Sequence, residues 1–151
     1  MIIEGTFEVA DRWRDTFYAF ERAARRQFEP VEPEPIGLHN CQRVIERAFE
    51  LYGWPSLPVH LRDGVPGQNV GTCSMCLDFF LIRLPTCRQR PWVALHEAAH
   101  AMTWGSFGSH NPLFTQLTIG LWSELGGWPR HELHVLAAEH NVALLVEEDV
   151  A

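Results

Sequence analysis

A predicted helix over residues 91–104 is the feature that most constrains the fold, because this segment is apolar on nearly all sides. Such a helix is stable only where other elements cover most of its circumference. Pro91 suits the first turn, since its φ is fixed and its missing N–H would have no partner there. The sequence therefore predicts a helix that is buried on nearly all sides.

Four further helices are predicted from apolar residues at helical spacing and from residues that begin or end helices. The first, 7–28, is amphipathic, and three prolines in the connector 29–35 end it. The second spans 38–52. Two more are expected after the apolar helix, over 111–125 and 129–146.

The middle of the chain has the pattern of β-strands. Apolar residues alternate with others over 57–61, and turn residues separate this segment from two more strand segments, 70–75 and 77–84. The order helix, helix, strands, helix, helix, helix indicates an α+β fold, with a small sheet of about three strands packed against helices. A chain of 151 residues fits one domain. We divide this domain, 1–151, into N-terminal helices (7–53), a sheet (57–84) and a helical part (91–147).

The formal net charge of −7 argues against direct nucleic-acid binding, because an acidic surface repels phosphate. The only basic cluster, Arg22, Arg25 and Arg26, stands beside Glu21 and Glu29, which is typical of a solvated helix face. No apolar run reaches the length of a membrane span, and the first residues lack the features of a signal peptide. We expect a cytoplasmic protein with reduced cysteines that binds neither nucleic acid nor membrane. The oligomeric state is not determined by the sequence.

The apolar helix contains the pattern His-Glu-x-x-His at residues 96–100. Residues four apart lie on one face of a helix, so His96 and His100 can direct imidazole nitrogens at one metal ion. Glu97 lies about 100° around the helix from His96, which suits contact with a water on the metal better than ligation. Zinc acidifies such a water and polarises a carbonyl, and a carboxylate can accept the proton. The pattern predicts one catalytic Zn2+ ion, with Glu97 as general base. Two structural histidines are the competing interpretation, which the cost of unpaired polar groups in an apolar helix disfavours.

A catalytic zinc ion usually has three protein ligands and one open position. His110 is the best candidate for the third ligand, because two glycines in the segment 105–112 let the chain turn back toward the helix it has left. Glu124, on the next helix, is the alternative. The pair His131 and His134 lacks the spacing of the first motif, and indicates an exposed helix face.

The segment Leu95-His96-Glu97-Ala98-Ala99-His100-Ala101, followed by Ser109-His110-Asn111-Pro112-Leu113-Phe114, resembles the SprT-like zinc metallopeptidases. It is more similar to a group of short metallohydrolases of that type, which share a His-Gly-Pro-x-Phe segment. The similarity covers residues 80–116 and, more faintly, 14–21.

This resemblance implies a minimal zincin-like domain with His96, His100 and His110 as zinc ligands and Glu97 as the base. The chain departs from the family at Asn111, where the family has glycine. Either the turn differs there, or the asparagine contacts substrate.

The expected function is that of a zinc-dependent metallohydrolase, specifically a metallopeptidase that hydrolyses a protein or peptide. A non-catalytic, zinc-stabilised protein-interaction module is the alternative, which the small size favours and the intact Glu97 disfavours. Some SprT-like relatives act on proteins crosslinked to DNA, a role that the charge of −7 disfavours here. The donor that would stabilise an oxyanion stays unassigned, with Tyr18, Tyr52, Arg90 and His134 among the candidates.

Cysteines offer a second metal site as an alternative. Cys73 and Cys76 form a Cys-x-x-Cys pair, whereas Cys41 and Cys87 stand apart from it. A four-cysteine zinc site usually has two close pairs, and free cysteine is commonly buried. We interpret these residues as buried or incidental thiols, with metal binding and redox chemistry as the alternatives.

Overall fold

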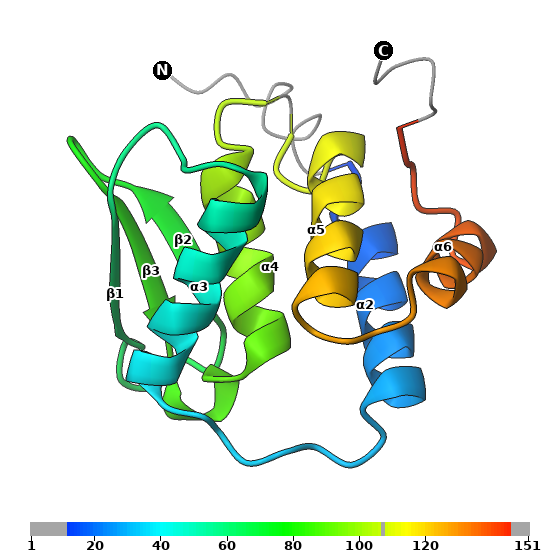
Figure 1. The fold of residues 1–151 in the computed structure, drawn as a ribbon, viewed down its shortest axis with the longest axis horizontal. Coiled ribbons are helices and arrows are strands. Elements are labelled where there is room, and N and C mark those ends of the chain that lie inside the picture. Colours follow the sequence, from blue (N-terminus) through cyan, green and yellow to red (C-terminus); the bar gives the residue numbers. More distant parts are fainter. Residues whose placement is uncertain (1–11, 107, 146–151) are drawn as a thin grey trace.

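The computed structural model describes residues 12–106 and 108–145, which form an α+β fold of five α-helices and one three-stranded sheet (Figure 1). The α-helices are α2 (Arg14–Phe28), α3 (Leu38–Tyr52), α4 (Pro91–Met102), α5 (Pro112–Glu124) and α6 (Arg130–Glu139). The strands are β1 (Val59–Asp63), β2 (Thr72–Met75) and β3 (Phe80–Leu84), and a 3-10 helix, η1 (Thr86–Arg88), follows them. The predicted class and order of elements are confirmed. No helix in the described ranges is long and apolar enough to cross a membrane.

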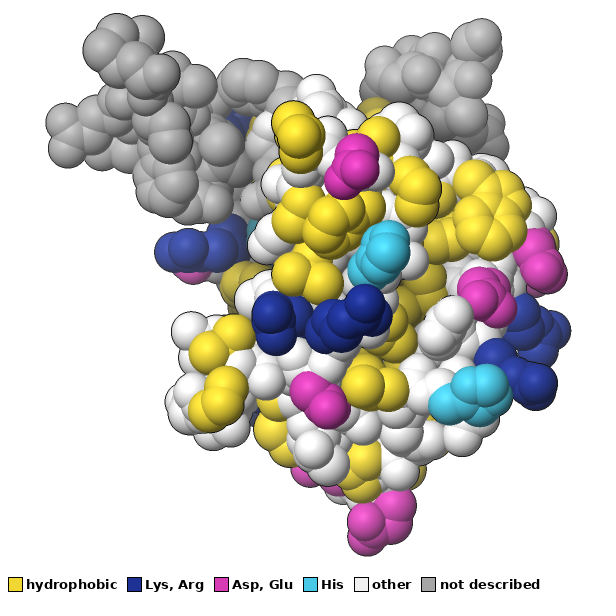
Figure 2. All heavy atoms as spheres, turned by 90° about the vertical axis from the view of Figure 1, so that its left-hand side faces the viewer, with side chains coloured by type: hydrophobic (Ala, Val, Ile, Leu, Met, Phe, Trp, Pro, Cys, Tyr) yellow, Lys and Arg dark blue, Asp and Glu magenta, His cyan; other side chains and the backbone are white. Residues whose placement is uncertain are grey.

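The sheet has the order β1-β3-β2, with β3 parallel to β1 and antiparallel to β2. Phe80, Ile82 and Leu84 alternate along β3 and are fully buried, because α3 and α4 pack on the sheet. Figure 2 looks at the side of the molecule that carries the sheet, where arginine, histidine and acidic side chains stand among apolar ones. The sheet therefore has one face in the core and one toward solvent.

Helix α4 is buried, as its apolar sequence predicts, because α3, α5 and the sheet all pack against it. Trp122 on α5 donates a hydrogen bond from Nε1 to the carbonyl oxygen of Trp92, 3.1 Å away, and so ties the two helices. Leu95 is fully buried, and burial of such a side chain stabilises the fold by roughly 1.5–3 kcal/mol. The histidine motif thus stands on a rigid, central element.

All three strands differ from the prediction at one end or both, and the second, predicted over 70–75, begins two residues later as β2. The apolar run 77–84 is not one strand, because residues 77–79 form the turn that joins the antiparallel strands β2 and β3. The N–H of Cys76 donates to the carbonyl oxygen of Phe79 across this turn at 2.7 Å, and Leu77 is 100% exposed. The first predicted strand, 57–61, begins and ends two residues later, as β1.

Two helix boundaries also differ. The first helix begins at Arg14 rather than at residue 7, since residues 12 and 13 form a turn; residues 7–11 lie outside the described ranges. The last helix ends at Glu139 rather than at 146, because Asn141 adopts a left-handed conformation with φ 56°. The N–H of Val142 then donates to the carbonyl oxygen of Ala137 at 2.9 Å. This 6→1 hydrogen bond defines a Schellman motif, which ends the helix.

Candidate metal centre

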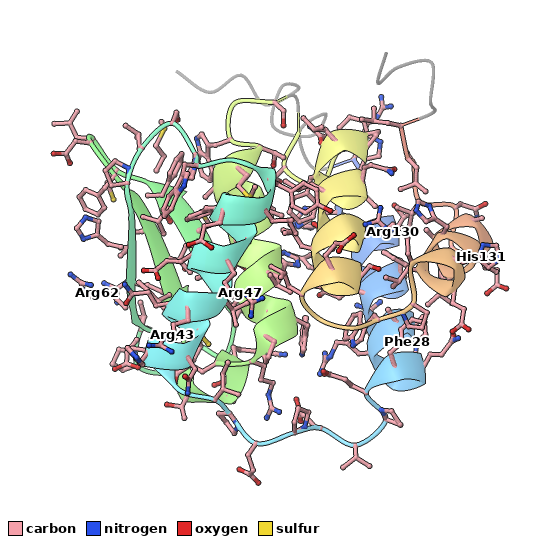
Figure 3. The ribbon with its side chains drawn as sticks, viewed as in Figure 1. Phe28, Arg43, Arg47, Arg62, Arg130 and His131 are labelled. Atoms are coloured by element: carbon pink, nitrogen blue, oxygen red, sulfur yellow. The ribbon has the colours of Figure 1, made fainter. Side chains whose placement is uncertain are left out.

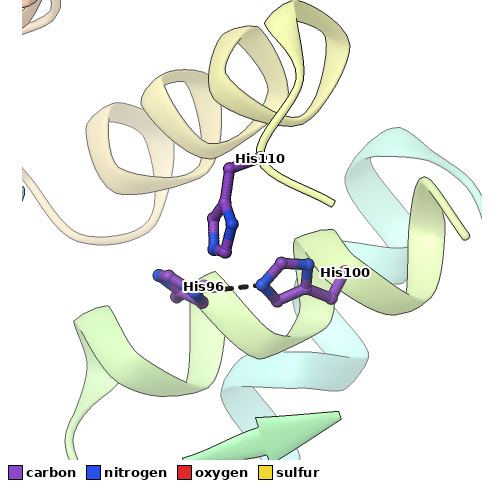
Figure 4. Close-up of side chains that lie close together, drawn as sticks. All are labelled: His96, His100 and His110. Atoms are coloured by element: carbon purple, nitrogen blue, oxygen red, sulfur yellow. Dashed lines mark hydrogen bonds between the residues drawn. The ribbon is translucent and has the colours of Figure 1, made fainter. Parts of the chain in front are cut away.

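His96 and His100 lie one turn apart on α4 and direct their rings to the same point (Figure 4). Their Nε2 atoms are 3.1 Å apart. Two nitrogens that each bind a tetrahedral zinc ion at 2.0–2.1 Å are themselves about 3.3 Å apart. The spacing within the pair therefore suits a shared ion.

The loop between α4 and α5 returns His110 to this pair. Asn111 follows directly as the N-cap of α5, accepting a hydrogen bond from the N–H of Phe114 at 2.8 Å and donating one to Ser106 Oγ at 2.8 Å. One ring nitrogen from each of His96, His100 and His110 lies within 4.8 Å of the other two (Figure 4). The structure thus brings all three predicted ligands together.

Asn111 explains the departure from the SprT-like pattern. Its φ of −71° is an ordinary conformation for any residue, so the turn has no need of glycine here. Its side chain caps α5 and fixes the loop, which orients the neighbouring His110.

Both ring nitrogens of His110 are buried without a hydrogen-bond partner among the described residues, and the residue is 5% exposed. Leaving a buried polar group unsatisfied costs about 1–3 kcal/mol, which a bound cation would offset. Three imidazoles suit zinc, copper, iron or nickel. The group therefore fits a metal ion, although the donor set alone does not select zinc.

Glu21 on α2 contacts this cluster through His96, and the sequence motifs do not include it. Its Oε2 lies 2.6 Å from Nδ1 of His96, and both side chains are buried. This contact makes Nδ1–H the donor and leaves Nε2 of His96 as the metal-binding atom. The available signal was a charged residue on the buried face of an amphipathic helix, between Phe20 and Ala24.

Burial and neighbouring charges shift the pKa of each histidine. Burial lowers the pKa of His100 well below its ordinary value, and His96 and His110 lower it further. Burial, followed by the charge of His96, lowers the pKa of His110 to about 3. Burial also opposes protonation of His96, but the carboxylates of Glu21 and Glu97 outweigh it and raise that pKa. His100 and His110 are therefore neutral at neutral pH, as metal ligands must be.

Glu97 lies beside His96, and both residues line one pocket. Its Oε1 is 3.9 Å from Nε2 of His96. Burial raises the pKa of Glu97 to about 7, with a further increase from Glu21 and a decrease from His96. A Cβ atom at Gly71 would lie 3.3 Å from Oε1, so the glycine leaves room for this carboxylate. A carboxyl group that titrates near neutral pH can both accept and donate a proton.

The alternative metal ligands lie outside this group. The side chain of Glu124 is 51% exposed and pairs with Arg130 at 3.1 Å. His131 is exposed on α6, as predicted, whereas His134 is half-buried (Figure 3). No cluster of cysteines that could hold a metal occurs within the described ranges. Cys41 is buried in α3, Cys73 and Cys76 are half-buried, and Cys87 is exposed.

Tyr18 is the one candidate oxyanion donor that lines the same pocket as His96 and Glu97. Its ring lies parallel to that of His96, with an interplanar angle of 3° and 6.1 Å between ring centroids. Arg90 is instead paired with Glu32 at 3.4 Å. The geometry therefore ranks Tyr18 above the other candidates.

Comparisons of the chain with protein-family models, with curated proteins and with solved structures find no match in any of the three. Any function assigned to the chain therefore depends on the residues of the site and their geometry.

Proposed function

We propose that the chain is a zinc-dependent metallohydrolase of SprT-like, zincin-like type, and specifically a metallopeptidase. His96, His100 and His110 would hold the zinc ion, and Glu97 would be the general base. The observation that supports this proposal is the convergence of three imidazoles, with Glu97 beside His96 in an adjoining pocket. The substrate would be a protein or peptide.

A bound zinc ion would polarise the substrate carbonyl and acidify a coordinated water. Glu97 would accept the proton of the attacking water on its carboxylate and return it to the leaving amine. Its raised pKa supports both transfers. Glu21 would hold the ring of His96 through Nδ1, and Tyr18 would donate to the negative charge that develops on the carbonyl oxygen.

The alternative, a non-catalytic module stabilised by zinc, is less well supported. A structural zinc site normally closes its fourth position with a protein ligand. In the part of the chain that the structure describes, no fourth side chain joins the three histidines. A structural site also has no need of a base, whereas Glu97 lies in the adjoining pocket.

The test combines metal analysis with a peptidase assay. Wild type should contain about one zinc ion per chain, and both His96→Ala and His110→Ala should lose it. Glu97→Gln should retain the metal and lose peptide hydrolysis, whereas Glu50→Gln, at an exposed site on α3, should retain both. Zinc that survives His96→Ala, or full activity in Glu97→Gln, would contradict the proposal.

A further inference from the structure

The pocket that contains His96 and Glu97 has a volume of about 330 Å³ and arginine side chains from two elements in its walls. Arg22 and Arg25 come from α2, and Arg88 comes from η1. His96 and Glu97 are buried, whereas all three arginines are partly or fully exposed. Cationic groups therefore lie between the candidate reaction centre and solvent.

α2 carries both Glu21, which contacts His96, and two of the arginines that line the pocket. Glu21 contacts His96, and one turn later the guanidinium of Arg25 lies over the ring of Trp92, 4.3 Å from its centroid. Trp92 lies one turn before His96, so α2 and α4 run antiparallel at this contact. Arg22 follows Glu21 directly and also lines the pocket.

The guanidinium groups retain hydrogen-bonding capacity. The guanidinium of Arg22 forms no hydrogen bond or ion pair with any residue in the described ranges. Arg88 uses Nε to donate to the carbonyl oxygen of Asn69 at 2.8 Å, which leaves its two terminal nitrogens. Arg25 is oriented by Trp92 and has a pair with the half-exposed Glu32 at 3.4 Å. Such an exposed pair is weak and can exchange for a ligand.

This concentration of positive charge contrasts with the rest of the chain, which has 19 acidic and 12 basic residues. Two further pockets adjoin the first through Arg25, and they add Arg26 and Arg90 to its cations. The only acidic residues that line these two pockets are Glu29 and Glu32. Arg22 and Arg26 are exposed and Arg25 is half-buried, which agrees with the solvated helix face that the sequence indicates, and this face also lines the pockets.

We infer that this pocket binds a carboxylate of the substrate beside the reacting bond, so that the substrate class is peptides with a carboxylate next to that bond. Guanidinium groups bind carboxylates through two parallel hydrogen bonds. Glu21 and Glu97 in the same pocket disfavour a doubly charged phosphate relative to a singly charged carboxylate. The carboxylate belongs either to an acidic side chain or to a chain terminus. The peptide-cleavage part of this inference rests on the proposed function, and the binding part does not.

Three small probes test the inference by titration of the full chain, both with zinc and after treatment with a chelator, followed by NMR. N-acetylglutamate α-methylamide carries only a side-chain carboxylate, N-acetylalanine carries only a terminal one, and N-acetylglutamine α-methylamide is neutral. At least one carboxylate probe should bind roughly tenfold more tightly than the neutral probe. The carboxylate probe that binds more tightly shows whether the pocket takes a side-chain or a terminal carboxylate. Arg22→Gln and Arg88→Gln should each weaken that binding by roughly tenfold. Arg43→Gln removes the same charge from α3 and should leave it unchanged (Figure 3).

Equal binding of the neutral probe, or unchanged binding in Arg22→Gln and Arg88→Gln, would overturn the inference. Unchanged binding in both arginine variants would indicate that the metal alone holds the carboxylate. Tighter binding of inorganic phosphate than of either carboxylate probe would overturn it as well. Because the titration needs no turnover, an inactive protein that binds the probes would contradict the proposed function only. Cleavage of neutral peptides without selective carboxylate binding would contradict the inference only.

Discussion

Oε2 of Glu21 lies 2.6 Å from Nδ1 of His96, although the two residues are 75 positions apart in the sequence. The contact joins α2 to α4 and is buried from solvent. It fixes both the tautomer and the orientation of His96, and the negative charge makes the ring a stronger metal ligand. α2 is therefore part of the candidate metal centre, although it supplies none of the three nitrogens.

Glu21→Gln should lower the zinc affinity by about ten- to a hundredfold, because it removes the charge while keeping the shape of the side chain. Competition with a chromogenic chelator measures this change. Glu50→Gln removes an exposed carboxylate from α3 and serves as the control. An unchanged affinity in Glu21→Gln would show that the contact does not tune the metal ligand.

Tyr18→Phe should lower kcat for peptide hydrolysis by roughly a hundredfold, because loss of one oxyanion donor typically has this effect. Zinc content should not change, since the ring that stacks on His96 is retained. The chain has two tyrosines, and Tyr52→Phe is the matched control at a site outside the pocket. A kcat that is unaffected by Tyr18→Phe would exclude this donor.

The parts of the site that the sequence predicts are those with local causes. His96 and His100 lie together because helical geometry brings residues four apart onto one face. His110 could be predicted because the glycines of its loop permit a reversal of the chain over a short distance. In contrast, the contact between Glu21 and His96 depends on how two helices pack, which spacing within either helix does not reveal.

The same distinction explains the boundaries that were wrong. Residues 77–79 continue an apolar run, but the antiparallel pairing of β2 with β3 requires a turn there. The end of α6 had a local signal, since asparagine adopts the left-handed conformation more readily than most residues. Asn141 carries that signal, and the apolar residues that follow it concealed it. Like Glu21, Arg22 and Arg25 could not be assigned to the site from the sequence alone. They line the pocket because α2 lies against α4 in the folded chain.

Asn111→Ala should lower the free energy of unfolding by about 1–2 kcal/mol, because the helix loses its N-cap. Asn111→Gly, which introduces the residue that the SprT-like pattern has at this position, should cost only a few tenths of a kcal/mol for the cap itself. Urea unfolding measures both variants, with Asn69→Ala at an exposed position as the control. Equal losses in Asn111→Ala and Asn111→Gly would show that the cap is not what the asparagine contributes.

His110 should make the metal-free protein less stable in acid. Its pKa is about 3 in the folded chain and 6.5 ordinarily, so the unfolded chain binds the proton more readily. Because the folded pKa is the lower one, the stabilising contribution is complete above pH 6.5 and is lost as the pH falls toward 3. The loss amounts to roughly 1.4 kcal/mol per pH unit at most. His96 and Glu97 have raised pKa values, so their contributions are instead lost as the pH rises.

A comparison with His110→Gln separates these opposing effects, since the variant retains His96 and Glu97. Urea unfolding of chelator-treated protein between neutral pH and about pH 5 gives the stability difference between wild type and variant. That difference should shift against wild type as the pH falls. A constant difference for His110→Gln would mean that the folded chain protonates His110 as readily as the unfolded chain does. Zinc would then compete with protons at His110 as well as at His96 near neutral pH.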